Sequence, residues 1–108
     1  MRRINLGELE ELVLLIVAVL NNKAYGVAVM QEIDRQTGRE VNISAIHSCL
    51  RRLEEKGYLS SDWGKSSSQR GGRRKRLYTV TQAGFKALIA LKETREKLWT
   101  QIPQISLS

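Results

Sequence analysis

The stretch from Val41 to Leu59 constrains the fold of this chain more than any other. In a helix, five of its apolar residues would share one face, and small polar or charged residues would occupy the opposite face. The apolar set is Ile43, Ile46, Cys49, Leu50 and Leu53, while Ser44, Ser48, Arg51 and Glu55 lie opposite and His47 and Arg52 lie at the flanks. Asn42 can cap this helix and Gly57 can end it. We therefore predict an amphipathic helix over residues 43–56, whose outward face of short polar groups and arginine suits a DNA major groove.

The segment before this helix predicts two further helices. Asn5 can cap a helix over residues 5–22, which is apolar on nearly all sides from Leu9 to Leu20. Such a helix must be buried on two sides, so in a small domain a second subunit is expected to cover one of them. The next helix is expected over residues 25–37, with its apolar residues at core spacing. Val41 could then add one short strand.

The segment after the amphipathic helix predicts a β-hairpin over residues 58–81. Tyr58–Trp63 and Leu77–Thr81 contain good strand formers, and the Gly- and Ser-rich residues 64–72 between them are typical of a loop. A last helix is expected over residues 82–101. Its apolar residues approximate a heptad seam, interrupted by an arginine; they are Leu88, Leu91, Leu98 and Ile102.

This order of three helices, a hairpin and a final helix is that of a winged helix-turn-helix domain. The predicted fold class is mainly α with a small β-hairpin, and the last helix is expected to mediate dimerisation. With 108 residues, the chain is expected to form a single domain over residues 1–108. In this fold the helix over residues 43–56 is the recognition helix and the hairpin over residues 58–81 is the wing.

Charge favours a polyanionic partner. The chain has 18 Lys and Arg against 11 Asp and Glu, a formal net charge of +7. No acidic residue occurs between Asp62 and Glu93, so the basic residues of the wing have no neutralising neighbour in sequence. The wing residues expected to contact DNA are Lys65, Arg70, Arg73, Arg74, Lys75 and Arg76. The alternative is that this run is a solvated basic loop.

Several of the remaining polar residues have two interpretations. Arg51, Ser44 and Ser48 are candidate DNA contacts, together with Asn42 at the start of the helix, although the same pattern also suits an ordinary solvated face. Arg52 could contact the groove or form an ion pair with Glu55. The imidazole of His47 could face DNA or pack against the protein. The Tyr25 hydroxyl could meet a phosphate or its ring could pack.

Other function classes have little support in the sequence. Cys49 and His47 are the only cysteine and histidine, so neither a disulfide nor a metal site is expected, and a reducing, cytoplasmic setting is the simplest. The apolar run Leu12–Leu20 is too short to span a membrane, so no membrane partner is expected. No catalytic set or phosphate-cradling loop appears, so we expect neither an enzyme nor a cofactor.

The motifs together resemble the PadR-like family of transcriptional regulators. The matching pieces are LGELEELVLL from Leu6, Tyr25-Gly26, TGREVNISAIHSCLRRLEEKGYL from Thr37, and RGGRRKRLYTVTQAG from Arg70. The resemblance implies a homodimeric winged helix repressor whose first and last helices form the dimer interface. It also implies that Tyr25 lies near the DNA backbone and that the face of Ser44, His47, Ser48 and Arg51 meets the major groove. His47 and Ser48 stand where relatives commonly have tyrosine and proline.

The predicted function is therefore a sequence-specific regulator of transcription that binds double-stranded DNA as a homodimer. The alternative is a winged helix that serves as a protein-interaction module without specific DNA binding, with its basic wing either solvated or facing an acidic partner. An RNA partner is disfavoured because the basic face lacks a set of stacking aromatic residues. Some relatives release DNA on binding small aromatic molecules, and Trp99 is the candidate for contacting such an effector. A tryptophan at the position of Trp99 is more often an anchor in the core or the dimer than a ligand contact, and Trp63 is expected to pack against the hairpin.

Overall fold

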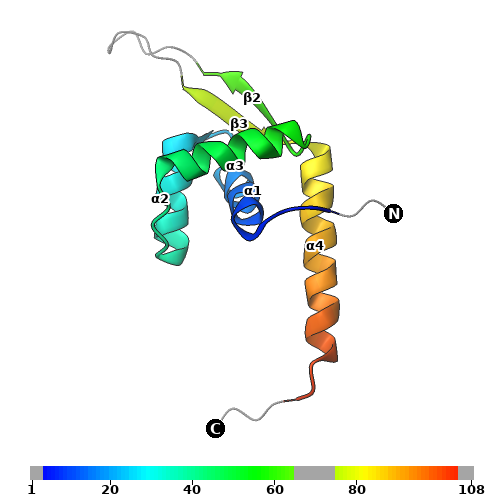
Figure 1. Ribbon diagram of the computed structural model, residues 1–108. Helices are drawn as coiled ribbons and strands as arrows, with labels where there is room; N and C mark the ends of the chain where they lie inside the picture. Colours follow the sequence, from blue (N-terminus) through cyan, green and yellow to red (C-terminus); the bar gives the residue numbers. More distant parts are fainter. Residues whose placement is uncertain (1–3, 65–74, 105–108) are drawn as a thin grey trace.

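The computed structural model describes residues 4–64 and 75–104. Its elements follow in the order α1 (Glu8–Leu20), β1 (Ala24–Tyr25), α2 (Gly26–Thr37), α3 (Ile43–Glu55), β2 (Leu59–Trp63), β3 (Arg76–Val80) and α4 (Gln82–Gln101). The first three helices pack together, the hairpin of β2 and β3 lies beside α3, and α4 runs away from them at one end (Figure 1). None of the described helices is both long enough and apolar enough to cross a membrane.

The core lies between the first three helices and the inner face of the sheet. Each of α1, α2 and α3 places apolar side chains at three- and four-residue spacing toward it, and burial of these side chains supplies the main stabilising free energy. The largest fully buried side chains are Val13, Leu14, Val17, Val29, Ile33, Ile46, Leu50 and Leu53. Leu59, Tyr78 and Val80 close the core from the sheet. The apolar face predicted for α3 is therefore confirmed.

Side-chain caps fix the starts of two helices, and the cap at Asn42 confirms the prediction. The Asn42 side chain accepts a hydrogen bond from the Ala45 N–H at 2.8 Å, and the Thr81 hydroxyl accepts one from the Gly84 N–H at 3.0 Å. At the other end of α3, Gly57 has a φ of +83°, a left-handed conformation that glycine adopts at no steric cost. Together these residues set the limits of α3 and the point at which α4 begins.

Two sequence predictions about local structure are wrong. Asn5 does not cap α1, which begins at Glu8 because the Glu10 carboxylate reaches back to accept a hydrogen bond from the Gly7 N–H at 2.8 Å. Val41 lies in no strand. The additional strand is β1, which immediately precedes α2 and pairs with β3 in a sheet of order β1-β3-β2. A two-residue strand has too little sequence to show the alternation that identifies longer strands.

Candidate nucleic-acid interface

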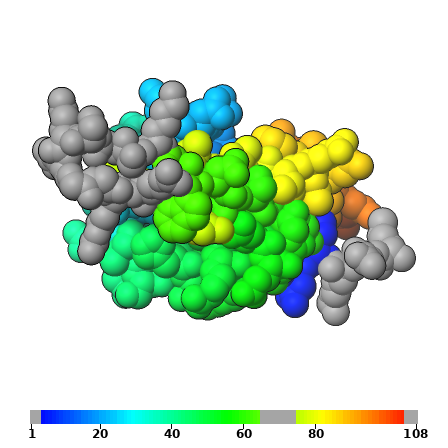
Figure 2. Space-filling model, turned by 90° about the horizontal axis from the view of Figure 1, so that it is seen from above, coloured from blue at the N-terminus to red at the C-terminus, as the bar shows by residue number. Residues whose placement is uncertain are grey.

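The outward side of α3 carries the residues predicted to meet DNA. Ser44, His47, Arg51 and Arg52 are exposed, while Ser48 is half-buried. Asn42, just before the helix, is also exposed, but its side-chain oxygen is already used in the cap. Seen from above, α3 and β2 form the middle of one face, with α2 at one end and the start of α4 at the other (Figure 2).

Behind this face, Cys49 is buried, and burial raises the pKa of its thiol. It therefore stays protonated and packs as a small hydrophobic residue, as the sequence predicted.

Tyr25 and His47 meet at the start of α2. Tyr25 is half-buried and pairs with Leu77 in the sheet, and its ring lies beside Gly64 at the base of the wing. A Cβ atom on Gly26 would lie 2.7 Å from Cε1 of His47, so the imidazole rests directly against the Gly26 backbone. Close approach of this kind requires glycine. His47 is thus both exposed and in contact with the protein, and its contact with DNA stays a prediction.

The wing contributes two described basic residues at its base, Lys75 and Arg76. The Lys75 ammonium lies 5.9 Å from the centre of the Tyr25 ring, and the Arg76 guanidinium lies 5.0 Å from the centre of the Trp63 ring. Trp63 is 59% exposed and lies outside the core, but its ring packs on the guanidinium of Arg76, its partner across the hairpin, in line with the expectation that it packs against the hairpin. The other predicted wing contacts, Lys65, Arg70, Arg73 and Arg74, lie outside the described residues.

These basic residues border a hollow of about 370 Å³ beneath the wing. It lies between the start of α2, the recognition helix and the inner face of the hairpin, and its lining is Tyr25, Gly26, Val27, His47, Trp63, Lys75, Arg76 and Tyr78. Aromatic surfaces with cationic groups at the rim can accommodate a sugar-phosphate segment, because the apolar parts contact the sugar while the cations pair with phosphate.

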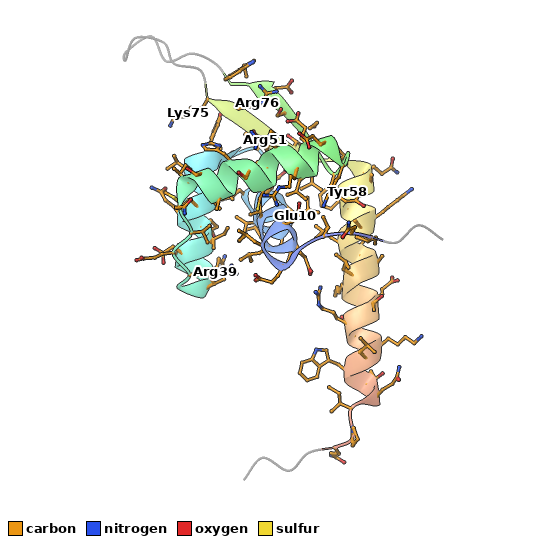
Figure 3. All side chains as sticks on the ribbon, viewed as in Figure 1. Glu10, Arg39, Arg51, Tyr58, Lys75 and Arg76 are labelled. Atoms are coloured by element: carbon orange, nitrogen blue, oxygen red, sulfur yellow. The ribbon has the colours of Figure 1, made fainter. Side chains whose placement is uncertain are left out.

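Ion pairs neutralise some of the described cations and leave others, including those around α3 and the wing, unpaired. Five are paired with carboxylates of α1, α2 or α4: Arg35 with Glu32, Arg39 with Glu8, Lys56 with Glu10, Lys92 with Glu96, and Arg95 with Glu11. Within residues 4–64 and 75–104, neither the arginines of α3 nor the two cations of the wing base take part in an ion pair, and the expected Arg52–Glu55 alternative is not formed. Figure 3 places Arg51, Lys75 and Arg76 on the wing side of α3, with Arg39 and Glu10 on the other side.

The pair between Lys56 and Glu10 holds the N-terminal segment against α3. Lys56 Nζ lies 3.0 Å from a Glu10 oxygen and donates to the Asn5 carbonyl at 2.7 Å. Burial raises the pKa of the Glu10 carboxyl, but the Gly7 N–H and the Lys56 ammonium lower it by more, so the net pKa lies below its ordinary 4.5. The Lys56–Glu10 pair therefore stabilises the fold, and it does not involve the cations on the other side of α3.

Sequence reasoning missed two polar residues near this surface, Glu54 and Ser61. The Ser61 hydroxyl donates to Glu54 at 2.6 Å and accepts a hydrogen bond from Arg76 Nε at 2.7 Å. Neither residue belongs to a motif, and their contact depends on how the hairpin lies against α3. No local pattern in the sequence could have indicated it.

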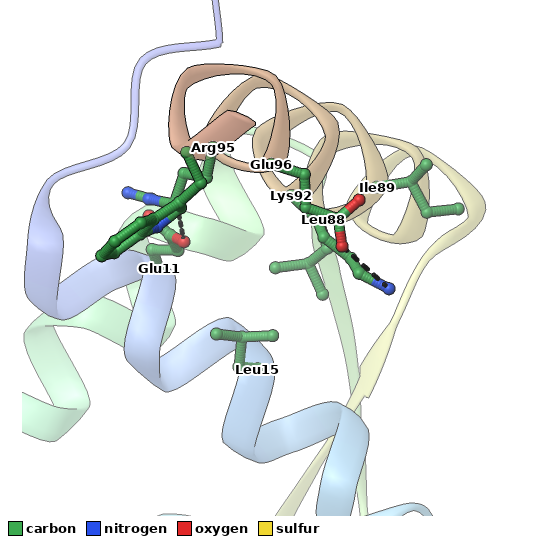
Figure 4. Close-up of a pocket in the computed structure, with 8 residues that line it drawn as sticks. Glu11, Leu15, Leu88, Ile89, Lys92, Arg95 and Glu96 are labelled. Atoms are coloured by element: carbon green, nitrogen blue, oxygen red, sulfur yellow. Dashed lines mark hydrogen bonds and ion pairs between the residues drawn. The ribbon is translucent and has the colours of Figure 1, made fainter. Parts of the chain in front are cut away.

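A second surface lies between α1 and α4. Trp99 is 72% exposed, so it is no part of the monomer core, and the apolar side chains of Leu15 and Ile89 are also exposed. They border a groove of about 410 Å³ with Leu88 and the charged pairs Glu11–Arg95 and Lys92–Glu96 (Figure 4). This surface is apolar at its centre and charged at its rim, an arrangement typical of protein interfaces.

Comparison with known proteins identifies related chains. A model of the PadR-like transcriptional regulator family matches residues 14–90. The structure of a PadR-like transcription factor from Bacteroides fragilis is 25% identical with a TM-score of 0.69, covering 83% of this chain and 82% of that one. A PadR family regulator from Eggerthella lenta is 26% identical with a TM-score of 0.68, covering 86% and 80%. A PadR-like regulator from Bacillus cereus, at 22% identity and a TM-score of 0.68, covers 85% and 84% and shows the same fold.

No curated protein sequence matches the chain significantly. The structural neighbours confirm the predicted winged helix fold, and the residues of the candidate interface fall within the part of the chain that the family model covers.

Proposed function

Because this chain belongs to the PadR-like family of transcriptional regulators, which bind DNA, we propose that it is a homodimeric repressor that recognises a palindromic DNA site. The observation that carries this proposal is the distribution of paired and unpaired cations. In the described residues, carboxylates neutralise Arg35 on α2, Lys92 and Arg95 on α4, and Arg39 and Lys56 in the segments that follow α2 and α3. Lys23, Lys86 and Lys97 form no ion pair there, and neither do Arg51, Arg52, Lys75 and Arg76, which lie together around the outward side of α3. Such a concentration of unneutralised charge attracts a polyanion.

In the proposed complex, α3 enters the major groove and the wing contacts the adjacent backbone or minor groove. Arg51 is the side chain best placed to read a base edge, supported by the polar residues of the same face: Asn42, Ser44, His47, Ser48 and Arg52. Phosphate contacts come from Tyr25 and the basic residues of the wing, which are Lys65, Arg70, Arg73, Arg74, Lys75 and Arg76. The recognition helix then selects the site, and the wing supplies most of the affinity.

Equilibrium DNA binding separates these two roles. Replacing Arg73, Arg74, Lys75 and Arg76 with alanine is expected to weaken binding to every sequence. It should also flatten the plot of log affinity against log salt by about 0.9 for each phosphate that the variant no longer neutralises. Arg51→Ala is expected to reduce discrimination between operator and random DNA. The matched control is Arg39→Ala, which removes one positive charge from the opposite side of α3, where it is paired with Glu8.

Different results would contradict the role proposed for the wing and the role proposed for Arg51. An unchanged salt slope in the wing variant would refute its phosphate contacts, and equal weakening on operator and random DNA would limit Arg51 to phosphate. The operator can be selected from genomic fragments at ~150 mM salt, where non-specific complexes have dissociation constants of roughly 10⁻⁴ to 10⁻⁶ M. Failure to select any sequence would favour the alternative, a winged helix that binds another protein.

The apolar surface between α1 and α4 supports the dimeric part of the proposal. Leu15, Val19, Ile89 and Leu98 are each more than 40% exposed, and the last turns of α4 extend beyond the other elements (Figure 1). A second copy covering this surface would remove its apolar area from water. The two recognition helices could then enter successive major grooves about 34 Å apart.

Trp99→Glu tests this interface, with Thr100→Glu as its control. Both substitutions add one negative charge at neighbouring exposed positions of α4, but Thr100 lies about 100° further round the helix, away from the apolar seam. Sedimentation equilibrium is expected to show monomers for Trp99→Glu and dimers for Thr100→Glu and the wild type. Dimeric Trp99→Glu would exclude this surface as the interface.

The same groove supports regulation by a small aromatic effector that releases DNA. Its volume of about 410 Å³ falls within the range of small-molecule sites, and the Trp99 ring offers a flat surface for stacking. Titration with flat aromatic compounds should quench Trp99 fluorescence and weaken operator binding together, in a protein whose other tryptophan has been replaced by Trp63→Phe. Unchanged fluorescence and DNA affinity would remove the effector from the proposal.

A further inference from the structure

A chain of hydrogen bonds joins the wing to the recognition helix. Arg76 Nε on β3 donates to the Ser61 hydroxyl on β2 at 2.7 Å, and that hydroxyl donates to a Glu54 carboxylate oxygen on α3 at 2.6 Å. The Arg76 guanidinium also lies 5.0 Å from the centre of the Trp63 ring. Three elements that are separate in sequence are thereby connected through polar side chains outside the apolar core.

The register of the sheet explains why these side chains meet. Arg76 is the partner of Trp63 and Tyr78 is the partner of Ser61, so all four share one face of the hairpin. Nearer the core this face is apolar and packs on α3, and toward the wing it becomes polar. Glu54 and Ser61 are both half-buried at this transition.

The two hydrogen bonds that join Arg76, Ser61 and Glu54 are stronger than bonds between neutral groups. Each has one ionised partner, and the hydroxyl between a guanidinium and a carboxylate is polarised from both sides. Nε is one of five N–H donors on the guanidinium, so the remaining donors of Arg76 can still face a phosphate. These hydrogen bonds therefore fix the direction of the Arg76 side chain and leave most of its N–H donors free to bind phosphate.

We propose that Glu54 and Ser61 are positioning residues for DNA binding. They hold Arg76 and the start of β3 at a set distance from α3, and so fix the spacing between the wing and the recognition helix without touching DNA themselves. This inference rests on the proposed DNA-binding function. According to this proposal, the Glu54 carboxylate strengthens DNA binding, although a negative charge on the basic side of the molecule would by itself weaken it.

The charge effect and the positioning role predict opposite changes in DNA affinity for Glu54→Ala, so this variant is compared with Glu55→Ala. Both variants remove one negative charge at adjacent positions of α3, but Glu55 is exposed and its side chain forms no ion pair or hydrogen bond within the described residues. Charge alone predicts that both variants bind DNA slightly more tightly. The positioning role predicts that only Glu54→Ala binds the operator more weakly, by roughly threefold to tenfold, with an unchanged salt slope.

Ser61 offers a second pair of variants, in case Glu54→Ala disturbs folding. Ser61→Ala removes the central hydroxyl and is expected to weaken operator binding, whereas Ser61→Thr keeps the hydroxyl and should bind nearly as the wild type does. In the free protein, NMR should show the Nε–H signal of Arg76 moving in Ser61→Ala and Glu54→Ala, but remaining in place in Glu55→Ala.

Operator affinity that rises equally in Glu54→Ala and Glu55→Ala would overturn the inference, as would an Arg76 Nε–H signal that does not respond to Ser61→Ala. Failure of the proposed function is distinguishable from either result. In that case the wild type would show no specific DNA binding at all.

Discussion

The first turn of α4 lies so close to the loop after α3 that Gly84→Ala, a substitution that normally stabilises a helix, is expected to destabilise this protein. Gly84 is buried in this first turn, and a Cβ atom placed there would lie 2.3 Å from the Tyr58 carbonyl oxygen and 2.8 Å from a Val80 methyl carbon. Ordinary carbon–oxygen contacts are about 3.3 Å or longer. Gly84→Ala therefore requires the backbone to separate by about 1 Å.

The expected magnitude follows from two opposing terms. In an unhindered helix, replacing glycine with alanine stabilises by up to about 1 kcal/mol. Overpacking costs about 1–3 kcal/mol, and here the upper end applies because the obstacle is a backbone carbonyl held by the Thr81 N–H at 3.1 Å. The net loss is about 2 kcal/mol, or roughly 10 °C in the melting temperature of a domain of this size.

Thermal and urea unfolding followed by circular dichroism at 222 nm measures this loss. All proteins should be compared at one concentration, since dimerisation adds to apparent stability. Gly38→Ala is the control: Gly38 has a φ of +71° with no atom within 4 Å of its would-be Cβ, so only backbone strain of about 1 kcal/mol is expected. A melting temperature that rises in Gly84→Ala would refute the close approach of α4 to Tyr58.

Three further predictions concern stability and DNA binding. Lys56→Ala should lower the free energy of unfolding by about 1–3 kcal/mol, since it leaves the buried Glu10 carboxylate without its ion pair, and urea unfolding measures it. In the wild type, the pKa of Glu10 is lowered by folding, so its ionised carboxylate stabilises the fold fully above pH 4.5, and this stabilisation is lost as the pH falls through the folded-state pKa. In Glu10→Gln, the free energy of unfolding should therefore fall less steeply as the pH is lowered through this range. Gly26→Ala should change operator affinity with little effect on melting, because the atom in its way is the far end of the His47 side chain, which can rotate away.

The sequence contained enough information for the fold because its signals are local. The spacing of apolar residues in α3, the cap at Asn42 and the turn at Gly57 each act within a few residues. The same holds for Thr81 and the start of α4. The start of α1 was misplaced because two cap arrangements compete there, and the buried Glu10 carboxylate favours the later one through its contact with Lys56.

The candidate site was less predictable, because its geometry depends on contacts between elements. The sequence indicated that Arg76 is basic and lies in the wing, but its bond to Ser61 appears only when β2 and β3 are in register. Likewise, the spacing of Arg52 and Glu55 permits an ion pair that the described structure does not form. Local spacing shows which pairs are possible, whereas the tertiary fold decides which of them are made.

Tertiary contacts also connect α4, the proposed dimerisation helix, to the proposed recognition helix α3. At the end of α3, the Thr81 hydroxyl donates to the Gly57 carbonyl at 2.7 Å, and the Thr81 N–H donates to Tyr58 as Gly84 closes against it. Figure 3 shows Tyr58 at this junction of α3 and α4. Because the start of α4 is held by backbone contacts, its direction relative to α3 has little freedom. A dimer formed through α4 would therefore fix the separation of the two recognition helices. A change in how the two α4 helices pair would then change the spacing of the half-sites that the protein can bind.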